Sequence, residues 1–186
     1  MKRLPVLLFL LWALPALALE VAGVNVADKA RVGASDLVLN GAGIRTRVIF
    51  KVYVGALYLG EKKTAAADAL ALPGAKRVAL TMLRELSAQQ LNEAFDSGIQ
   101  ANNGAAEVEA FKPRIAELLS LLTDAKKGDV IVLDFLPESG TVVTLNGAVR
   151  GKPIPGEDFY RAVLRIWLGD KPVDADLKKG MLGGAA

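Results

Sequence analysis

The sequence predicts an α+β fold in which helices cover one face of an antiparallel sheet. Strand-like segments lie early and late in the chain, at residues 21–60, 76–83 and 130–145, and helix-periodic segments lie between and after them. That order is typical of a sheet with its own helical layer. No linker-like composition or internal repeat divides residues 19–186, so we expect a single domain there.

Residues 1–18 have the three-part pattern of a secretory signal peptide. The basic start Met1-Lys2-Arg3 precedes an apolar run that ends in Ala16-Leu17-Ala18, a small-x-small cleavage site. The apolar run is shorter than the roughly 20 residues that span a bilayer, which argues against a membrane anchor. We therefore expect cleavage after Ala18, and a periplasmic or otherwise exported protein without stable membrane insertion.

The composition excludes several classes of function. Without Lys2 and Arg3, the 23 Lys and Arg fall to 21 against 20 Asp and Glu, so the processed chain is nearly neutral and nucleic acid is not an expected partner. The chain has no Cys and no His. Disulfides, a Ser-His-Asp triad, a Cys nucleophile and thiolate or imidazole metal sites are therefore impossible. We expect no metal and no other cofactor.

Residues 39–60 alternate between two kinds of side chain, as strands with one dry and one mixed face do. The apolar parity holds Ile44, Val48, Phe50, Val52, Val54 and Ala56, and the mixed parity holds Arg45, Arg47, Lys51 and Tyr53. The three cations either form a solvated face or line a site for an anion. A mixed face that helices partly cover would form a cleft with apolar walls and a cationic end, where arginine can hold a carboxylate through two parallel hydrogen bonds.

The next elements have local signals of their own. A short helix within residues 64–74 ends at Pro73-Gly74, and a strand follows at residues 76–83. Ser87 and Gln90 have the spacing of a capping box. The helix after them has an apolar face at i, i+4 and i+8, made of Leu91, Phe95 and Ile99.

The second half of the chain contains helix, hairpin and helix in turn. A helix is expected over residues 105–123, where Pro113 either kinks it or marks its true start. Residues 130–136 and 141–145 are strand-like, and Asn146-Gly147 is a strong hairpin turn. A helical pattern then follows at Phe159, Val163 and Ile166.

Other apparent motifs favour structural roles. The segment NGAGIR lacks the third glycine of a dinucleotide-binding fingerprint. The segment VDADLKK, at residues 173–179, lacks the glycine and distal glutamate of a calcium loop, so we interpret it as a helix cap. Asp134, within VIVLDFL, is expected to be an exposed strand residue rather than a catalytic base.

From about Ala34 to its end, the chain resembles the chalcone isomerase-like proteins, in particular their exported bacterial branch. The resemblance rests on the segments LNGAGIRTRVIFKVYVGALYL, LSAQQLNEAFDSGIQANN, KKGDVIVLDFLPESGT and GEDFYRAVLRIWLGDKPVDADLKKGMLG. It implies an open-faced β-sandwich, a large antiparallel sheet with a helical layer on one face and a ligand cleft between them. The family includes isomerases that close a chalcone to a flavanone and members that bind fatty acids.

The resemblance also assigns site residues. The arginine of the G-x-R segment, which faces the ligand, falls on Arg45, and the fatty-acid-binding members pair it with a tyrosine, here Tyr53. The isomerases instead have a threonine there, and they have a tyrosine where this chain has Leu91 and an asparagine where it has Gly98. Tyr53 therefore matches the binding version, and Arg47 and Lys51 are expected at the rim or in water.

We therefore predict a non-catalytic binding protein for a fatty acid or similar apolar carboxylate. Its predicted ligand-binding residues are Arg45, Tyr53, Leu91 and Phe95, and no residue is assigned a catalytic role. Two alternatives remain open. One is an intramolecular lyase or isomerase acting on an unsaturated ketone, with Arg45 stabilising an oxyanion. The other is an interaction module whose cleft is filled by its own side chains.

Overall fold

The computed structural model describes residues 19–184, so the expected signal peptide lies outside the described residues. The strands are β1 (Leu19–Val21), β2 (Val24–Val26), β3 (Lys29–Val32), β4 (Ser35–Arg47), β5 (Phe50–Leu59), β6 (Lys76–Met82), β7 (Val130–Leu136), β8 (Gly140–Leu145) and β9 (Ala148–Ile154). The helices are α1 (Ala66–Ala71), α2 (Ala88–Asn102), α3 (Ala105–Leu121), α4 (Glu157–Leu168) and α5 (Ala175–Met181).

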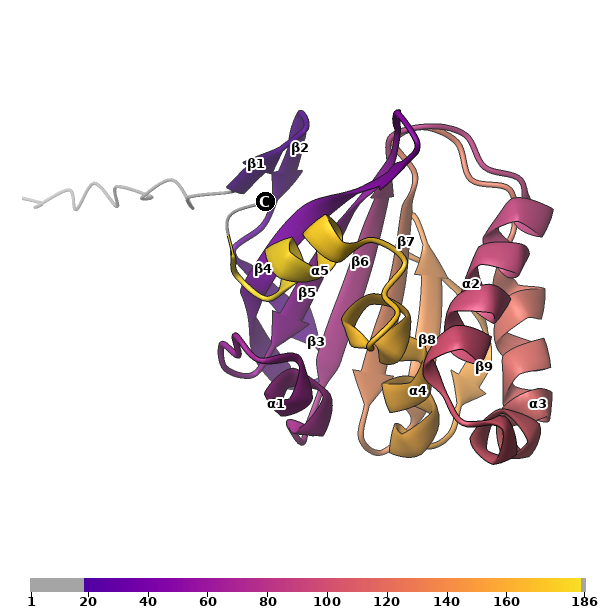
Figure 1. Ribbon diagram of the computed structural model, residues 1–186. Helices are drawn as coiled ribbons and strands as arrows, with labels where there is room; N and C mark the ends of the chain where they lie inside the picture. Colours follow the sequence, from indigo (N-terminus) through magenta and orange to yellow (C-terminus); the bar gives the residue numbers. More distant parts are fainter. Residues whose placement is uncertain (1–18, 185–186) are drawn as a thin grey trace, which may run out of the picture.

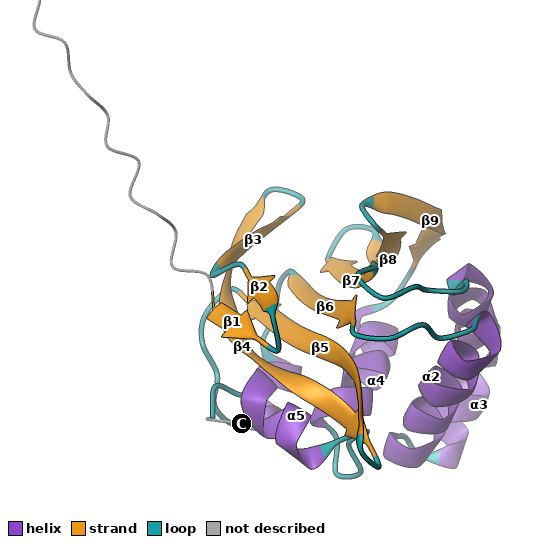
Figure 2. Cartoon of the chain, turned by 90° about the horizontal axis from the view of Figure 1, so that it is seen from above, coloured by secondary structure: helices purple, strands orange, loops and turns teal. Residues whose placement is uncertain are grey.

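Strands β3 to β9 form one antiparallel meander, in which every strand pairs with its neighbours in sequence (Figure 1). Strands β1 and β2 form a separate hairpin. Helices α2, α3, α4 and α5 lie together on one side of this curled sheet (Figure 2). The α+β prediction is therefore confirmed. Among the described residues, no helix is both long enough and apolar enough to cross a membrane.

The main core lies between the sheet and the helices. Helix α4 is its centre, because eight of its twelve residues are buried, among them Phe159, Tyr160 and Trp167. Helix α2 contributes its predicted apolar face, since Leu91, Phe95 and Ile99 are all buried. The predicted capping box is present as well: Ser87 Oγ accepts from the Gln90 amide, and Gln90 Oε1 accepts from the Ser87 amide.

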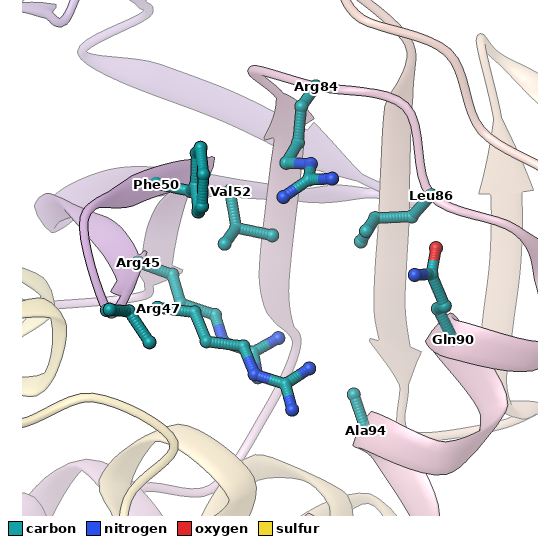
Figure 3. A pocket seen from close by; sticks show the side chains of 9 residues that line it. Arg45, Arg47, Phe50, Val52, Arg84, Leu86, Gln90 and Ala94 are labelled. Carbon is teal, nitrogen blue, oxygen red and sulfur yellow. The ribbon is translucent and has the colours of Figure 1, made fainter.

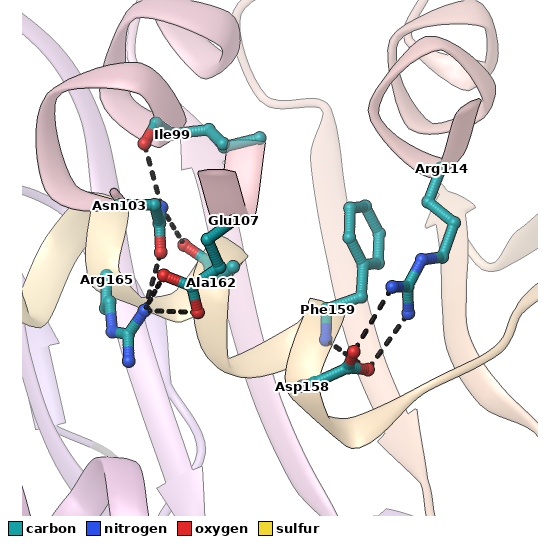
Figure 4. Close-up of polar contacts among 8 residues, drawn as sticks. All are labelled: Ile99, Asn103, Glu107, Arg114, Asp158, Phe159, Ala162 and Arg165. Carbon is teal, nitrogen blue, oxygen red and sulfur yellow. Dashed lines mark hydrogen bonds and ion pairs between the residues drawn. The ribbon is translucent and has the colours of Figure 1, made fainter. Parts of the chain in front are cut away.

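Two pairs of charged side chains join α3 to α4, and Asn103, at the C-terminal end of α2, takes part in one of these contacts (Figure 4). Arg165 of α4 donates to Asn103 Oδ1 at 2.7 Å and to Glu107 of α3 at 3.0 Å. Arg114 of α3 donates from both terminal nitrogens to the Asp158 carboxylate of α4, at 2.9 and 3.2 Å. The helical layer is thus held together by directional contacts at its outer surface, in addition to its apolar core.

A smaller apolar core lies on the other face of the sheet. Asp134 lies on that face, and its burial shows that the prediction of an exposed strand residue was wrong. That carboxylate is only 8% exposed, because Arg77 of the neighbouring strand donates to both of its oxygens at 2.6 Å. The Arg77 guanidinium also donates to the Arg31 carbonyl of β3, which the curl of the sheet brings near. Asp134 is therefore half of a structural ion pair and not a solvated strand residue.

Two further sequence interpretations need correction. Helix α3 begins eight residues before Pro113 and continues through it, so Pro113 does not mark the true start of the helix. Val48 and Phe50, which the alternation placed on the dry face, are 90% and 56% exposed. The reason is that the chain turns at residues 48–49, so Val48 lies in the hairpin turn itself and Phe50 is the first residue of β5, next to that turn.

Helix α5 packs on a part of the sheet where the residues that face it are glycines. Gly43 and Gly55 pair across β4 and β5, and they share their face with Gly41. A β-carbon on Gly41 would lie 2.1 Å from the Gly180 carbonyl oxygen of α5, and one on Gly55 would lie 3.1 Å from Leu177. Glycine at these positions therefore allows the helix to approach the strands at backbone distance.

Side-chain caps fix both ends of α5 to β4. At the N-terminus, Asp174 Oδ1 accepts from the Asp176 and Leu177 amides, and its Oδ2 accepts from the Thr46 amide at 2.8 Å. At the C-terminus, the buried Asn40 side chain donates to the Met181 carbonyl at 2.7 Å. The predicted capping role of residues 173–179 is confirmed, and the helix has one defined position on the sheet.

We expect Gly41→Ala to destabilise the fold by roughly 2–3 kcal/mol, because the added methyl group meets the backbone of α5 rather than a movable side chain. Gly60→Ala is the matched control, since a β-carbon there has no neighbour within 4 Å, and its effect should stay within about 0.5 kcal/mol. Urea unfolding followed by circular dichroism measures both. Equal stability of the two variants would contradict the close packing of α5.

Candidate functional site

A cavity of about 240 Å³ lies between the β4–β5 hairpin, the β6–α2 connection and the N-terminal half of α2 (Figure 3). Its apolar walls come from all three of these parts: Val48, Phe50, Val52, Leu86 and Ala94. Val52 and Leu86 are buried. Val52 is unpaired opposite the register shift between Arg45 and Thr46, where β5 contains one more residue than β4. Such bulges redirect side chains at the edges of functional sites.

Three arginines supply the polar part of the wall. Arg45 and Arg47 project from the end of β4, and Arg84 projects from the connection after β6 (Figure 3). Gln90, in the first turn of α2, completes it. Within residues 19–184, none of these arginines takes part in an ion pair. Three neighbouring cations without a carboxylate partner produce a positive potential that an anion would relieve.

A second, more open hollow of about 450 Å³ continues from the same arginines along α2. The two hollows share Arg45, Arg47, Gln90 and Ala94. Polar side chains of the second hollow include Glu93, Ser97 and Lys171. Arg45 and Arg47 therefore lie where a cavity with partly apolar walls meets a more polar groove, which is an arrangement suited to an amphipathic molecule.

Tyr53 lies next to Arg45 on the same face, since the two residues pair across β4 and β5. The Arg45 guanidinium is 5.5 Å from the centre of the Tyr53 ring, close enough for a cation–π interaction. The Tyr53 hydroxyl accepts a hydrogen bond from Trp167 Nε1 of α4 at 2.8 Å. Phe95 packs edge-on against Trp167, with 5.7 Å between ring centres.

The Tyr53 hydroxyl is close to two hydrogen-bond donors, Trp167 and Arg45, but to no acceptor for its own hydrogen among the described residues. Indole and guanidinium groups donate only, so neither Trp167 nor Arg45 can accept the Tyr53 hydroxyl hydrogen. Within the described part of the chain, no other acceptor takes that hydrogen. Burial raises the pKa of Tyr53, and the charge of Arg45 and the bond from Trp167 oppose that rise without cancelling it. The hydroxyl therefore keeps its proton at neutral pH and remains a donor.

The four predicted site residues occupy different depths. Arg45 lines the cavity, whereas Tyr53, Leu91 and Phe95 are 3%, 2% and 4% exposed and are not among its lining residues. The Tyr53 ring is in contact with the Arg45 guanidinium. Leu91 and Phe95 belong to the core between α2 and α4. Whether the four bind a ligand stays a prediction. Arg47 and Lys51 are exposed, as expected, but Arg47 also lines the cavity.

Sequence reasoning missed seven lining residues, namely Val48, Phe50, Val52, Arg84, Leu86, Gln90 and Ala94. Gln90 was interpreted only as half of the capping box. Arg84 had a usable signal. In a meander, the end of β6 lies beside the start of β5, so an arginine directly after β6 must lie near residues 50–53.

Of the three positions at which the isomerases differ, Leu91 and Gly98 are closed by packing. Leu91 faces the core. A β-carbon on Gly98 would lie 2.8 Å from Ile166 Cγ2 of α4, so a larger side chain at that position would force the Ile166 side chain to move. Among residues 19–184, no group of three or more acidic side chains has the arrangement of a metal site.

The fold and the site together define an open-faced α+β sandwich with a cationic cavity at one end of its sheet. A sequence profile of the chalcone isomerase-like family matches residues 18–183, and the chain belongs to that family. A solved structure with the same fold is that of a fatty-acid binding protein from Arabidopsis thaliana. Its TM-score is 0.67 at 15% identity, over 89% of this chain and 95% of that chain. No curated protein sequence matches this chain.

We expect the Tyr53–Trp167 hydrogen bond to appear as an energetic coupling. Tyr53→Phe leaves the buried indole N–H without an acceptor, which costs roughly 1–3 kcal/mol of unfolding free energy. In the double variant with Trp167→Phe that cost disappears, so the two substitutions are non-additive by about 1 kcal/mol or more.

Urea unfolding followed by circular dichroism measures this cycle. Tyr58→Phe is the control, because the Tyr58 hydroxyl bonds to the Ala27 carbonyl in the core on the opposite face of the sheet. Its effect should add to that of Trp167→Phe. Additivity in the Tyr53 cycle as well would show that the hydrogen bond contributes nothing.

Proposed function

We propose that the protein binds a fatty acid or a similar amphipathic carboxylate without transforming it. The observation that carries this proposal is the convergence of Arg45, Arg47 and Arg84, none of them ion-paired among the described residues, on one apolar-walled cavity. Tyr53, which is buried next to Arg45 and does not line the cavity, holds a hydroxyl hydrogen without an acceptor among the described residues. Arginine forks and hydroxyls are donors that match a carboxylate, which is an acceptor only.

The cavity sets the expected placement of the ligand. The carboxylate lies at Arg45 and Arg47, where the apolar cavity meets the polar groove, and the chain lies against Val52, Leu86 and Phe50. The volume of about 240 Å³ is below the roughly 300–1,000 Å³ of typical small-molecule pockets. The cavity therefore suits a short acid, or the carboxyl end of a longer one whose tail leaves past the exposed hairpin.

Family membership and the plant structure support a binding role, because that plant protein is a fatty-acid binding protein. The isomerase alternative has weaker support. Leu91 has no hydroxyl to organise a water molecule, and a side chain at Gly98 is opposed by Ile166. The interaction-module alternative requires a filled cleft, and the cavity beside Arg45 argues against that.

We expect Arg45→Ala to weaken the binding of decanoate or palmitate by about 10- to 100-fold, the loss typical of a hydrogen bond to a charged group. Arg45→Lys should be intermediate, because it keeps the charge but loses the fork. Arg31→Ala is the control, since Arg31 is an exposed arginine of β3 outside the cavity. Isothermal titration measures all four proteins.

A matched ligand sharpens this test. The alcohol with the same chain as each acid keeps the apolar tail but lacks the negative charge, and it should bind wild type about as weakly as the acid binds Arg45→Ala. Equal affinity of wild type for acid and alcohol would show that the arginines do not recognise a carboxylate. Absence of binding by either ligand would overturn the proposed function.

We further propose that the protein is exported to the periplasm and belongs to the exported bacterial branch of its family. The leader pattern of residues 1–18 supports this, and the family profile begins at residue 18, next to the expected cleavage site. Intact-mass measurement on protein from its native cells should give a chain that begins at Leu19 in the periplasmic fraction. A chain that retains residues 1–18 in the cytoplasm would contradict export.

A further inference from the structure

The β4–β5 hairpin presents three consecutive apolar side chains to solvent. Val48, Ile49 and Phe50 are 90%, 79% and 56% exposed. Among residues 19–184 the other large apolar residues that are exposed, Leu19 and Val149, lie on other strands. Single exposed apolar residues are ordinary, but three together at a protruding tip need a reason.

The turn residue itself is unfavourable for folding. Val48 has a φ of 60°, in the left-handed region that β-branched residues rarely adopt. The β8–β9 hairpin of the same sheet uses Asn146 and Gly147 at φ of 52° and 79°, which are the residues that such turns prefer. Asparagine or glycine would therefore stabilise the β4–β5 turn as well. A strained valine at this tip points to a role other than folding.

Positive charge surrounds the tip. Arg47 and Lys51 flank it along the chain, and the Arg84 guanidinium lies 5.4 Å from the centre of the Phe50 ring. Glu85 is the acidic residue next to Arg84 in sequence. On α5, the Asp174 carboxylate is already bound to the Thr46 amide and to its own helix. The tip thus combines an apolar point with a net positive rim.

We infer that the β4–β5 hairpin docks the protein on the surface of an anionic lipid bilayer. The apolar residues 48–50 enter the headgroup region, and Arg47, Lys51 and Arg84 meet lipid phosphates. A protein partner fits less well, because a convex tip of three side chains falls far short of the roughly 800 Å² that each side of a standard protein interface buries.

The proposed function explains why the protein would dock on a bilayer, and in this respect the inference rests on it. Val48 and Phe50 line the cavity as well as forming the tip, so docking would place the cavity mouth against the bilayer. An amphipathic acid could then pass between bilayer and cavity with its tail shielded from water. The contact is peripheral and involves no membrane-spanning segment.

Sedimentation with lipid vesicles tests the docking. Processed protein beginning at Leu19 is used, so that the apolar leader cannot anchor it. We expect wild type to pellet with vesicles of mixed phosphatidylcholine and phosphatidylglycerol but not with phosphatidylcholine alone, and to be released at high salt. Ile49→Asp should weaken partitioning by about tenfold or more, and Arg47→Gln by about fivefold.

The matched control is Val149→Asp, which adds the same charge at an exposed apolar residue of β9, outside the hairpin. It should partition like wild type. No wild-type binding to anionic vesicles, or equal binding by Ile49→Asp, would overturn the inference. So would concentration-dependent dimerisation that Ile49→Asp abolishes without any vesicle binding, because the tip would then bind a second copy.

The two proposals fail separately. Titration of Ile49→Asp with soluble decanoate reports on the cavity without any bilayer. Vesicle binding by wild type together with no decanoate binding would leave the docking intact and refute the proposed ligand. Decanoate binding without vesicle binding would do the reverse.

Discussion

The strip of glycines on β4 and β5 is the constraint on which the site depends. Because alternate residues of a strand share a face, Gly41, Gly43 and Arg45 follow one another on the side of β4 that the helices cover. Helix α5 occupies the part of that face without side chains, at backbone distance. Its N-terminus, held by Asp174 at Thr46, ends beside the first side chain beyond the strip. Arg45 therefore lies at the edge of the helical layer because it is the first residue with a side chain after Gly41 and Gly43 on this face of β4.

The chemistry of the site follows from donors brought together from three elements. Arg45 comes from β4, Tyr53 from β5 and Trp167 from α4, and the tyrosine oxygen receives the indole hydrogen. Structural networks in protein interiors are usually complete, with each buried hydrogen donated to an acceptor. This one lacks an acceptor within the described chain, and the neighbouring arginines lack a counter-ion. A carboxylate bound in the cavity would supply that counter-ion, which is why a binding role explains more of the charge at this site than a purely structural one.

Short sequence patterns predicted the helices, strands and turns well, but they could not predict contacts between residues on different strands and helices. The capping box at Ser87 and the Asn146-Gly147 turn depend on neighbours in sequence, and both are present. The burial of Asp134 depends on Arg77, 57 residues away on the next strand. The depth of Tyr53 likewise depends on Trp167, and alternation alone cannot say which partner lies above a face. Arg45 could be singled out because a family resemblance added long-range information to the alternation.

The failure at Val48 is of a different kind, because the local rule itself was broken there. Alternation carried straight through residues 44–56 since no glycine, asparagine or proline marks the turn at Val48 and Ile49. The sequence has favourable turn residues at the β8–β9 hairpin but apolar residues at the β4–β5 hairpin. The lower stability expected of the β4–β5 turn indicates that its residues serve a function. Val48 and Phe50, which alternation misassigned, are exposed together with Ile49 at the hairpin beside the cavity, with cations around them. Where local sequence and local structure disagree in this protein, the disagreement lies at the mouth of the candidate site.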